Sequence, residues 1–298
     1  MGTDDGNVQI TQGGGKNWTN VRPNVHGIDG DPIVSWVEAN RYSGTTAYVT
    51  FDAHMSGDSR PYVFRTTDLG KTWQQLDTQS SGVRGYAHVV KEDTDNPDLL
   101  FLGTEFGLRV SIDGGKRWAQ YSGSSFPNVA GRDIVVHPRT SDLVIATHGR
   151  GIWVIDDISP WRLLTPELIA NEAAFFPMPP VVQYISEFAG WPEGDNAFHG
   201  PGRPEDAQIT YYQRSRHIFG DLKIEIFDEN GKFVDSVVSS GHRGVNRATW
   251  VMHLKAPRVP PAATAMFQAA QGPQVPPGEY TVKLTKVDQV YTTKIKLS

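Results

Sequence analysis

The stretch Ser111-Ile-Asp-Gly-Gly-Lys-Arg-Trp118 occurs in related form at two earlier places in the chain. These copies read Thr66-Thr-Asp-Leu-Gly-Lys-Thr-Trp73 and Thr11-Gln-Gly-Gly-Gly-Lys-Asn-Trp18. The shared pattern is Ser/Thr-x-Asp-x-Gly-x-x-Trp, and the tryptophans lie 55 and 45 residues apart. Because a period of roughly 40–50 residues built of short strands is typical of propeller blades, the repeat predicts an all-β propeller in the first half of the chain.

The pattern has a structural explanation that needs no ligand. An Asp carboxylate can accept backbone N–H groups across a tight turn, and the Gly two places later supplies a positive φ angle. The Trp begins the next strand and can pack its indole between neighbouring sheets. We therefore assign Asp68, Trp73, Asp113 and Trp118 a structural role, and expect a looser turn in the first copy, where Gly13 replaces the Asp.

Alternating apolar residues predict four strands in each full repeat. The expected strands are, in chain order, Ile33–Glu38, Thr46–Phe51, Tyr62–Thr66, Trp73–Leu76, Tyr86–Glu92, Leu99–Thr104, Leu108–Ile112, Trp118–Tyr121, Asp133–His137, Leu143–Thr147, Ile152–Ile155 and, as a candidate, Trp161–Leu164. The first repeat keeps only its last three strands. We therefore expect a partial β-propeller of about four blades.

The composition changes after Asp157, which indicates a second part of the chain. We expect Asp-box β-propeller blades over residues 1–158, a Pro/Gly-rich connector over 159–215 and an immunoglobulin-like β-sandwich over 216–298. Within the connector, Pro166–Asn171 is predicted to form a short helix with Thr165 as its cap.

Charge and cysteine content exclude several classes of function. The net charge of −5, without a basic run, argues against nucleic acid as a partner. The absence of Cys excludes disulfides and thiolate metal sites. No apolar stretch has the length of a membrane span. The N-terminus lacks a signal peptide and opens inside a repeat, so we expect a fragment of a longer protein.

The repeated pattern is known as the Asp box, and it also occurs in sialidases. Four further phrases, taken together with the three copies of the Asp box, are specific for one family. These phrases are Gly103-Thr-Glu-Phe-Gly107, His148-Gly-Arg-Gly-Ile-Trp-Val-Ile-Asp-Asp157, Ile209-Thr-Tyr-Tyr212 and Pro277-Gly-Glu-Tyr-Thr-Val282. The chain resembles the C-terminal part of large bacterial Asp-box (BNR-repeat) proteins of the sortilin-like superfamily, which are labelled glycosyl hydrolases. The resemblance implies a carbohydrate-directed, extracytoplasmic parent protein, either periplasmic or secreted.

In a propeller, the start of each first strand and the turn between the second and third strands lie on one face, opposite the Asp boxes. A glycosidase needs two carboxyl groups about 5 Å apart for retention or 6.5–9.5 Å apart for inversion. On this face we favour Glu105 as general acid, because Phe106 beside it can raise its pKa, and Asp133 as base or nucleophile. The alternative is that both satisfy turn amides. The other carboxylates on this face are Asp4, Asp5, Asp31 and Asp58.

Four further residues are candidates for binding substrate. His148 and Arg150 alternate with two glycines, and Arg132 and Tyr86 are the Arg and the Tyr that a sialidase-like site could use. Packing against a neighbouring blade would explain the first pair equally well. A sialidase would need an Arg cluster, for which Arg60, Arg132 and Arg150 would have to converge.

Neither a metal nor a cofactor is expected, because His54, His88 and His148 lack a short metal-ligand spacing and no Gly-rich phosphate loop occurs. No strained nucleophile turn of a Ser hydrolase is present either.

A non-catalytic propeller scaffold that binds glycans or protein partners is the competing class. Trp191, Tyr211 and Tyr212 can stack on sugars or peptides. A separation beyond about 10 Å between the carboxyl groups of Glu105 and Asp133 would favour this class over a glycosidase.

An open array of blades leaves unpaired strand edges. The N-terminal strands could close a small ring with the last blade, the connector and sandwich could cover the edge, or a homodimer could form through the open propeller edge. We favour covering by the apolar connector, with a homodimer as a further alternative.

Overall fold

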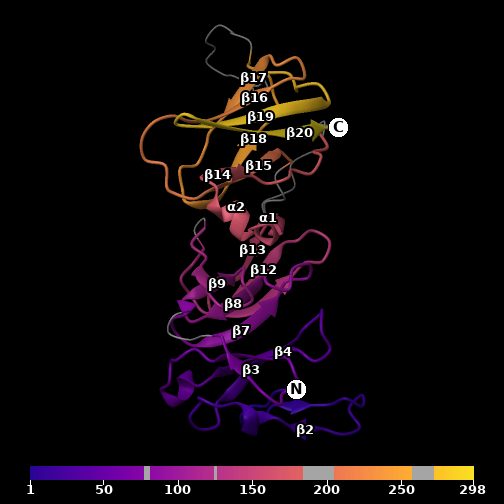
Figure 1. The fold of residues 1–298 in the computed structure, drawn as a ribbon, viewed down its shortest axis with the longest axis vertical. Helices are drawn as coiled ribbons and strands as arrows, with labels where there is room; N and C mark the ends of the chain where they lie inside the picture. The colour runs from indigo at the N-terminus through magenta and orange to yellow at the C-terminus, as the bar shows by residue number, and fades with distance from the viewer. Residues whose placement is uncertain (77–80, 124–125, 184–204, 257–271) are drawn as a thin grey trace, which may run out of the picture. The chain divides into compact units, whose positions relative to one another are not determined.

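The computed structural model describes residues 1–76, 81–123, 126–183, 205–256 and 272–298. The chain forms two compact units, Met1–Arg162 and Leu163–Ser298 (Figure 1). Both units are built from small antiparallel sheets, and the described residues contain one short α-helix in each unit. The prediction of an all-β protein is therefore confirmed.

The described residues of unit 1 form four sheets, in which each strand pairs with the next one along the chain. Figure 1 shows these sheets following one another from the N-terminal strands to β12 and β13. The strands are β1 (Gln9–Ile10) and β2 (Thr19–Asn20); β3 (Ile33–Ala39), β4 (Ala47–Asp52), β5 (Val63–Thr66) and β6 (Gln74–Gln75); β7 (Ala87–Glu92), β8 (Leu100–Thr104), β9 (Gly107–Ser111) and β10 (Ala119–Gln120); and β11 (Gly131–Val136), β12 (Leu143–Thr147) and β13 (Ile152–Ile155). The described residues also include the 3₁₀ turns η1 (Arg22–Asn24) and η2 (His54–Ser56).

The sheets of unit 1 are held together by apolar clusters between successive sheets. In β8, Leu100 and Leu102 pack in one cluster with Tyr48 of β4, whereas Phe101 packs in another with Ile134 of β11. Successive side chains of a strand point to opposite faces, so β8 is buried on both sides. A strand buried in this way reads as a continuous apolar run rather than as an alternating one.

The last sheet of unit 1 presents an apolar face to solvent. Its register pairs Val135 with Val144 and Val144 with Val154, and it pairs Ala146 with Ile152. These residues therefore share one face, where Val135, Ile152 and Val154 are 49%, 72% and 54% exposed. An exposed apolar sheet face is typical of an interaction surface.

The candidate strand Trp161–Leu164 was wrong, because residues Ser159–Arg162 form helix α1 instead. Asp157 has a φ angle of 49°, and its carboxylate accepts the N–H of Ser159, which turns the chain away from the sheet. The Trp161 ring then packs 6.0 Å from that of Phe101. The sequence shows that Trp161 is apolar and therefore suited to burial, but it does not show whether a helix or a strand carries the side chain into the core.

Unit 2 begins with helix α2 (Pro166–Ala170), which the sequence predicted. The Thr165 hydroxyl accepts a hydrogen bond from the Leu168 N–H at 3.3 Å, and Pro166 stands at the first helical position. Cap and proline together define where the helix starts.

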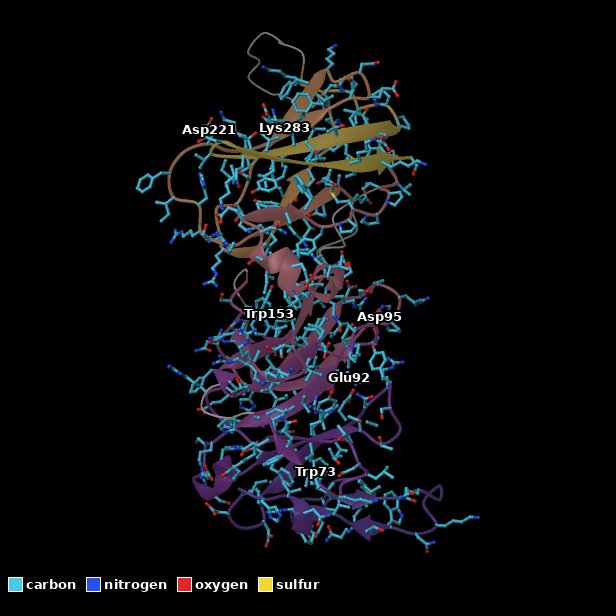
Figure 2. The ribbon with its side chains drawn as sticks, viewed as in Figure 1. Trp73, Glu92, Asp95, Trp153, Asp221 and Lys283 are labelled. Carbon is cyan, nitrogen blue, oxygen red and sulfur yellow. The ribbon has the colours of Figure 1, made fainter. Side chains whose placement is uncertain are left out.

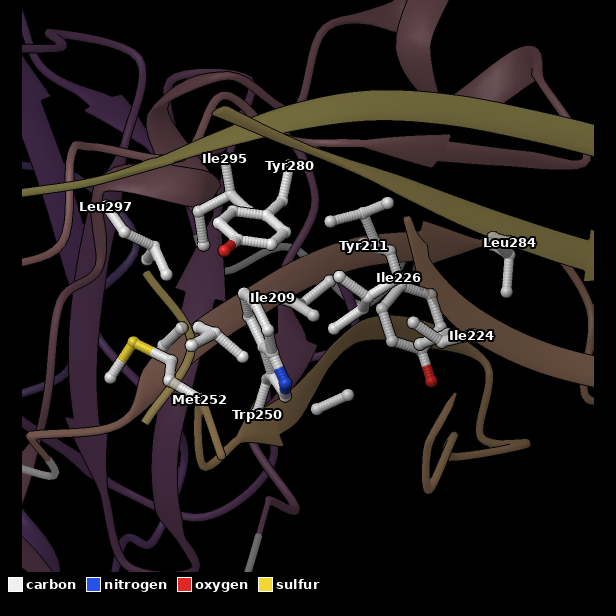
Figure 3. Close-up of a cluster of buried hydrophobic side chains, with 14 of the residues drawn as sticks. Ile209, Tyr211, Ile224, Ile226, Trp250, Met252, Tyr280, Leu284, Ile295 and Leu297 are labelled. Carbon is white, nitrogen blue, oxygen red and sulfur yellow. The ribbon is translucent and has the colours of Figure 1, made fainter. Parts of the chain in front are cut away.

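Two sheets of unit 2 share one apolar core. One sheet has the order β14 (Ala173–Phe175), β15 (Ala207–Gln213) and β18 (Gly244–Trp250); the other has β17 (Phe233–Val237), β16 (Leu222–Phe227), β19 (Gly278–Lys286) and β20 (Gln289–Leu297). Figure 3 shows Ile209, Tyr211 and Trp250 close to Ile226 and Tyr280 within this core. The Trp250 and Tyr280 rings make an edge contact at 5.2 Å between centroids. Large aromatic side chains thus supply much of the buried area.

The expected domain boundaries at residues 158 and 215 differ from the division between the units, which falls after Arg162. Part of the expected connector forms β14 and β15 and belongs to a sheet of unit 2. Strand β15 reads as Ala-Gln-Ile-Thr-Tyr-Tyr-Gln, which is rich in residues that favour strands. The immunoglobulin-like topology of unit 2 stays a prediction.

Candidate functional site

The second and third Asp boxes close their turns with contacts among their own residues. The Asp68 carboxylate accepts the N–H of Thr72 at 2.9 Å and the hydroxyl of Thr72 at 2.7 Å. Asp113 likewise accepts the N–H of Arg117 at 3.0 Å and its guanidinium Nε at 3.0 Å. These partners lie four residues away along the chain. Such contacts stabilise a turn without shaping a binding surface.

The tryptophans of the three boxes differ in burial. Trp118 is 5% exposed and its indole N–H donates to the carbonyl of Leu76, whereas Trp18 is 47% exposed. Trp73, labelled in Figure 2, is half-buried against the cluster that contains Val21. In the first box, where Gly13 lacks a carboxylate, the N–H groups of Gly13 and Gly15 donate to the Thr11 hydroxyl.

At the opposite end of these sheets, a buried carboxylate gathers side chains from several strands. Asp52 ends β4, and its side chain is 5% exposed. Its Oδ1 lies 2.5 Å from Nδ1 of His54 and also accepts the backbone N–H of His54 at 3.1 Å. Its Oδ2 lies 3.1 Å from Nδ1 of His88 and 3.9 Å from Nη1 of Arg132. We call Asp52, His54, His88 and Arg132, together with Tyr86, the Asp52 cluster.

Tyr86 provides the aromatic surface of the Asp52 cluster. The His54 ring stacks on it with centroids 4.3 Å apart and an interplanar angle of 16°. Arg132 lies over the same ring, with Cζ 5.7 Å from its centroid, and Nη2 donates to the phenol oxygen at 3.4 Å. Arg132 Nη1 is also 3.1 Å from His88 Nδ1. The structure therefore brings together two of the expected substrate-binding residues, Tyr86 and Arg132.

Irregularities at matching positions in three sheets help to place these side chains. The pairing of the first two strands shifts between Val34 and Trp36, between Ala87 and Val89, and between Gly131 and Asp133. The residues inside these shifts are Ser35, His88 and Arg132. A bulge turns a side chain out of the regular alternation and is frequent beside active sites. The same local feature thus contributes both His88 and Arg132 to the cluster.

The electrostatics of the cluster keep Asp52 ionised and Tyr86 neutral. Burial by itself raises the pKa of Asp52, but the hydrogen bonds of His88 and His54 outweigh it and lower that pKa below its usual range. Burial also raises the pKa of Tyr86; the Arg132 charge opposes this, whereas Asp52 and Glu105 add to it. Tyr86 is therefore a hydrogen-bonding group at neutral pH.

Glu105 lies beside Tyr86, in the turn between β8 and β9. Its backbone N–H donates to the carbonyl of Tyr86 at 2.9 Å. Its side chain covers Gly85, since a Cβ added there would lie 2.8 Å from Oε2 of Glu105. A larger residue than Gly85 would therefore displace this carboxylate.

Asp133 is oriented differently from Arg132. Its carboxylate accepts the N–H of Ile134 at 2.7 Å, and its place in β11 puts it on the same face as Val135. Within the described residues, no hydrogen bond or ion pair links Asp133 with Glu105. The assignment of these two as a catalytic pair stays a prediction.

His148 and Arg150 stand in the turn between β12 and β13. The N–H of His148 donates to the carbonyl of Ala130 at 2.8 Å, and the Trp153 indole N–H donates to the carbonyl of Arg150 at 3.0 Å. These contacts use the backbone, so they define the turn rather than a role for either side chain. In the described part of the chain neither side chain joins the Asp52 cluster through a hydrogen bond.

A cleft of about 470 Å³ adjoins the Asp52 cluster. Ala53, which lies between Asp52 and His54, forms part of its wall. Arg60 lies in the cleft and binds Asp58, with Nη2 to Oδ2 at 2.7 Å, and this contact is the main cause of the lowered pKa of Asp58. The cleft is lined by Asp29, Gly30, Asp31, Pro32, Ala53, Ser56, Gly57, Asp58 and Arg60.

Arg60 pairs with the carboxylates of Asp29 and Asp58, whereas Arg132 contacts Tyr86 and His88. Among the described residues no group of His, Asp and Glu is arranged to hold a metal ion. No helix in the described ranges is long and apolar enough to cross a membrane. Trp191 lies outside the described residues.

Sequence reasoning missed Asp52, although a signal for it existed. Asp52 ends the second strand of its repeat, and Thr104 ends the second strand of the next one, immediately before Glu105. The phrase Phe51-Asp-Ala-His54 has neither the threonine nor the glycines of Gly103-Thr-Glu-Phe-Gly107, which spans the same turn of the next repeat, so the two turns do not look alike in the sequence.

Comparison with known proteins yields structural likenesses only. No family model and no curated protein matches the chain. The structure is similar to the GH74 xyloglucanase from Xanthomonas campestris, with 14% identity, a TM-score of 0.42 and coverage of 98% of this chain and 41% of that protein. The structure is also similar to the GH74 enzyme from Niastella koreensis, with 19% identity, a TM-score of 0.39 and coverage of 52% of this chain and 26% of that protein.

A third likeness is to PorZ from Porphyromonas gingivalis, a surface component of the type-IX secretion system, with 11% identity, a TM-score of 0.32 and coverage of 89% of this chain and 30% of that protein. The chain spans less than half the length of each of these three proteins.

Proposed function

We propose that this chain is a carbohydrate-directed protein of the Asp-box glycoside hydrolase type, with its site at the end of unit 1 that carries the Asp52 cluster. The observation that carries the proposal is the matching register shift in three sheets, which turns His88 and Arg132 toward the buried Asp52. Partly exposed donors beside an aromatic ring suit a sugar, which offers hydroxyl groups and an apolar ring face.

The catalytic roles in this proposal fall to Glu105 and Asp133. Glu105 adjoins Tyr86 and its neighbour Phe106, so it lies within reach of a ligand on the Asp52 cluster. Glu105 would protonate the leaving oxygen and Asp133 would act as base or nucleophile, according to the separation of their carboxyl groups. His148 and Arg150, in the neighbouring turn, would extend the binding surface.

The same proposal covers the architecture and setting of the chain. We take the four sheets of unit 1 as propeller blades and unit 2 as an immunoglobulin-like sandwich, in a sortilin-like parent that acts outside the cytoplasm. The exposed face with Val135, Ile152 and Val154 supports a homodimer through the open propeller edge, since it would otherwise stay in water.

A panel of chromogenic glycosides and a glycan array would test the proposal. We expect turnover of at least one glycoside by the wild-type chain, and a fall of kcat of about 10²-fold or more in Glu105→Gln and in Asp133→Asn. Glu229→Gln, in the hairpin turn of unit 2, is the matched control and should keep wild-type activity. Absence of both turnover and glycan binding would contradict the proposal.

One observation favours the alternative, a non-catalytic scaffold that binds glycans or protein partners. The Asp133 carboxylate accepts the N–H of its own neighbour Ile134 and lies on the face of the exposed Val135, which agrees with a role in satisfying backbone amides. If this scaffold is correct, the array would show binding that Arg132→Gln weakens, while the glycoside panel would show no turnover.

A further inference from the structure

The two nitrogens of the His54 ring have different surroundings. Nδ1 lies 2.5 Å from Oδ1 of the ionised Asp52, so this nitrogen carries the ring proton. Nε2 makes no hydrogen bond within the described residues, and the His54 side chain is 29% exposed. Since Nδ1 faces Asp52, Nε2 is the ring nitrogen left for a ligand or a water molecule.

The ring is also held in place from several directions. Asp52 binds both the side chain and the backbone N–H of His54, and Tyr86 stacks against the ring face. His54 begins the 3₁₀ turn η2, which Gly57 ends in a left-handed conformation with φ of 85°. A carboxylate that binds Nδ1 of a fixed imidazole is the arrangement that orients a general base.

The other charged and titratable groups around this ring come from three further elements. His88 belongs to the start of β7, and Tyr86 lies immediately before this strand. Glu105 lies in the turn after β8, and Arg132 belongs to β11. Arg132 and His88 both approach Oδ2 of Asp52, whereas His54 uses Oδ1. The two oxygens of Asp52 thus serve separate partners, which leaves Oδ1 for the alignment of His54.

We propose that His54 is the general base of this site and that Asp52 is its positioning residue. The inference rests on the proposed function, but His54 replaces Asp133 as the base. Asp133→Asn should then keep its kcat, whereas a fall in kcat is expected only if Asp133 is the base. The water oxygen bonds to the anomeric carbon while its proton moves to Nε2 of His54. The bond from that carbon to the leaving oxygen breaks, its electron pair stays with the oxygen, and Glu105 supplies the proton.

The first test needs no turnover. In the ¹⁵N-labelled full chain at neutral pH, the imidazole nitrogen shifts of His54, assigned by their loss in His54→Gln, should show a protonated Nδ1 and an unprotonated Nε2. Asp52→Asn should abolish this preference, whereas Asp221→Asn in unit 2 should keep it. A wild-type His54 with the proton on Nε2 overturns the inference, and this result does not depend on whether Asp52→Asn folds.

The second test uses whichever glycoside the panel shows to be hydrolysed. His54→Gln should lower kcat by about 10²–10⁴-fold and change KM little, while His242→Gln in unit 2 keeps both values. Turnover that survives His54→Gln overturns the base assignment alone, whereas a panel without any turnover overturns the proposed function as well.

Discussion

Asp113 and Asp52 lie at opposite ends of neighbouring sheets and use their carboxylates in different ways. Asp113 binds Ser111 and Arg117, which belong to its own turn. Asp52 binds His54, and it also binds His88, which is 36 residues away on another sheet. A carboxylate with local partners closes a turn, whereas one with partners from several sheets builds a site. The Asp-box end of the sheets therefore serves stability, whereas the opposite end carries the candidate site.

The largest loss of stability is expected when the ion pair between Asp93 and Arg162 is broken. This pair joins residues far apart in the sequence but lies at the Asp-box end, so it tests whether a long-range partner is enough to mark a functional site. Arg162 binds both oxygens of the buried Asp93, at 2.8 and 2.9 Å, from 69 residues away. Arg162→Met should lower the unfolding free energy of unit 1 by about 3–5 kcal/mol, since it leaves a buried charge unpaired. Chemical denaturation of the full chain measures this.

Arg117→Met is the matched control for Arg162→Met. The Arg117 side chain is 81% exposed in its pair with Asp113, so its removal should cost about 0–1 kcal/mol. Glycan binding should be unchanged in both variants. An Arg162→Met chain of wild-type stability would show that the Asp93 contacts to the N–H groups of Asp95 and Asn96 suffice.

A smaller effect is expected for Asp113→Ala. It leaves the Arg117 N–H and the Ser111 hydroxyl without their acceptor, which should cost about 1–3 kcal/mol. Asp68→Ala should lower the melting temperature in the same direction. Neither should change ligand binding, because both turns lie opposite the Asp52 cluster. A variant that keeps its melting temperature but loses binding would contradict the division between the two ends.

The pH dependence of stability gives a third measurement. Hydrogen bonds of the Thr72 backbone and hydroxyl lower the pKa of Asp68 from 3.8 to about 2. A carboxyl with a lowered folded pKa stabilises the protein above pH about 4, and that stabilisation is lost as the pH falls toward 2. The melting temperature should therefore fall less between pH 4 and 2 in Asp68→Asn than in the wild type. Equal falls would show that Asp68 is not linked to folding.

The smallest effect should be a gain of stability in the first Asp box. Gly13 is exposed, and no side chain would clash there, since the nearest atom to an added Cβ is 4.0 Å away. Gly13→Asp should add about 0.5–1 kcal/mol by accepting turn N–H groups, as Asp113 does. Gly13→Ala is the control for the loss of glycine flexibility. If both substitutions stabilise equally, the carboxylate contributes nothing in this turn.

Much of the secondary structure could be predicted from the sequence. The predicted strands Leu143–Thr147 and Ile152–Ile155 have the bounds of β12 and β13. Thr165 and Pro166 likewise located helix α2. These predictions succeeded because alternation, capping and turn residues act over a few positions. Trp161 failed because its burial comes from packing against Phe101 and Tyr121, and not from a strand.

The candidate site was predicted only in part. The sequence offered Tyr86 and Arg132 as candidates for binding substrate, and in the structure Nη2 of Arg132 lies 3.4 Å from the phenol oxygen of Tyr86. The Asp52 carboxylate that organises them was missed, since nothing near it in the chain reports that His88 and Arg132 will approach. The register shifts at His88 and Arg132 were equally invisible, because a bulge depends on the pairing of two strands.

The sequence by itself determined the repeat, the Asp-box turns and most strand positions, because each of these depends on hydrogen bonds and side-chain alternation among residues a few positions apart. Only the tertiary structure decided which polar residues would meet. Stacking of successive sheets buries apolar faces without regard to the polar groups at the strand ends, and it thereby brought Arg132 to His88 across 44 residues. A buried carboxylate such as Asp52 persists there because these partners satisfy its oxygens.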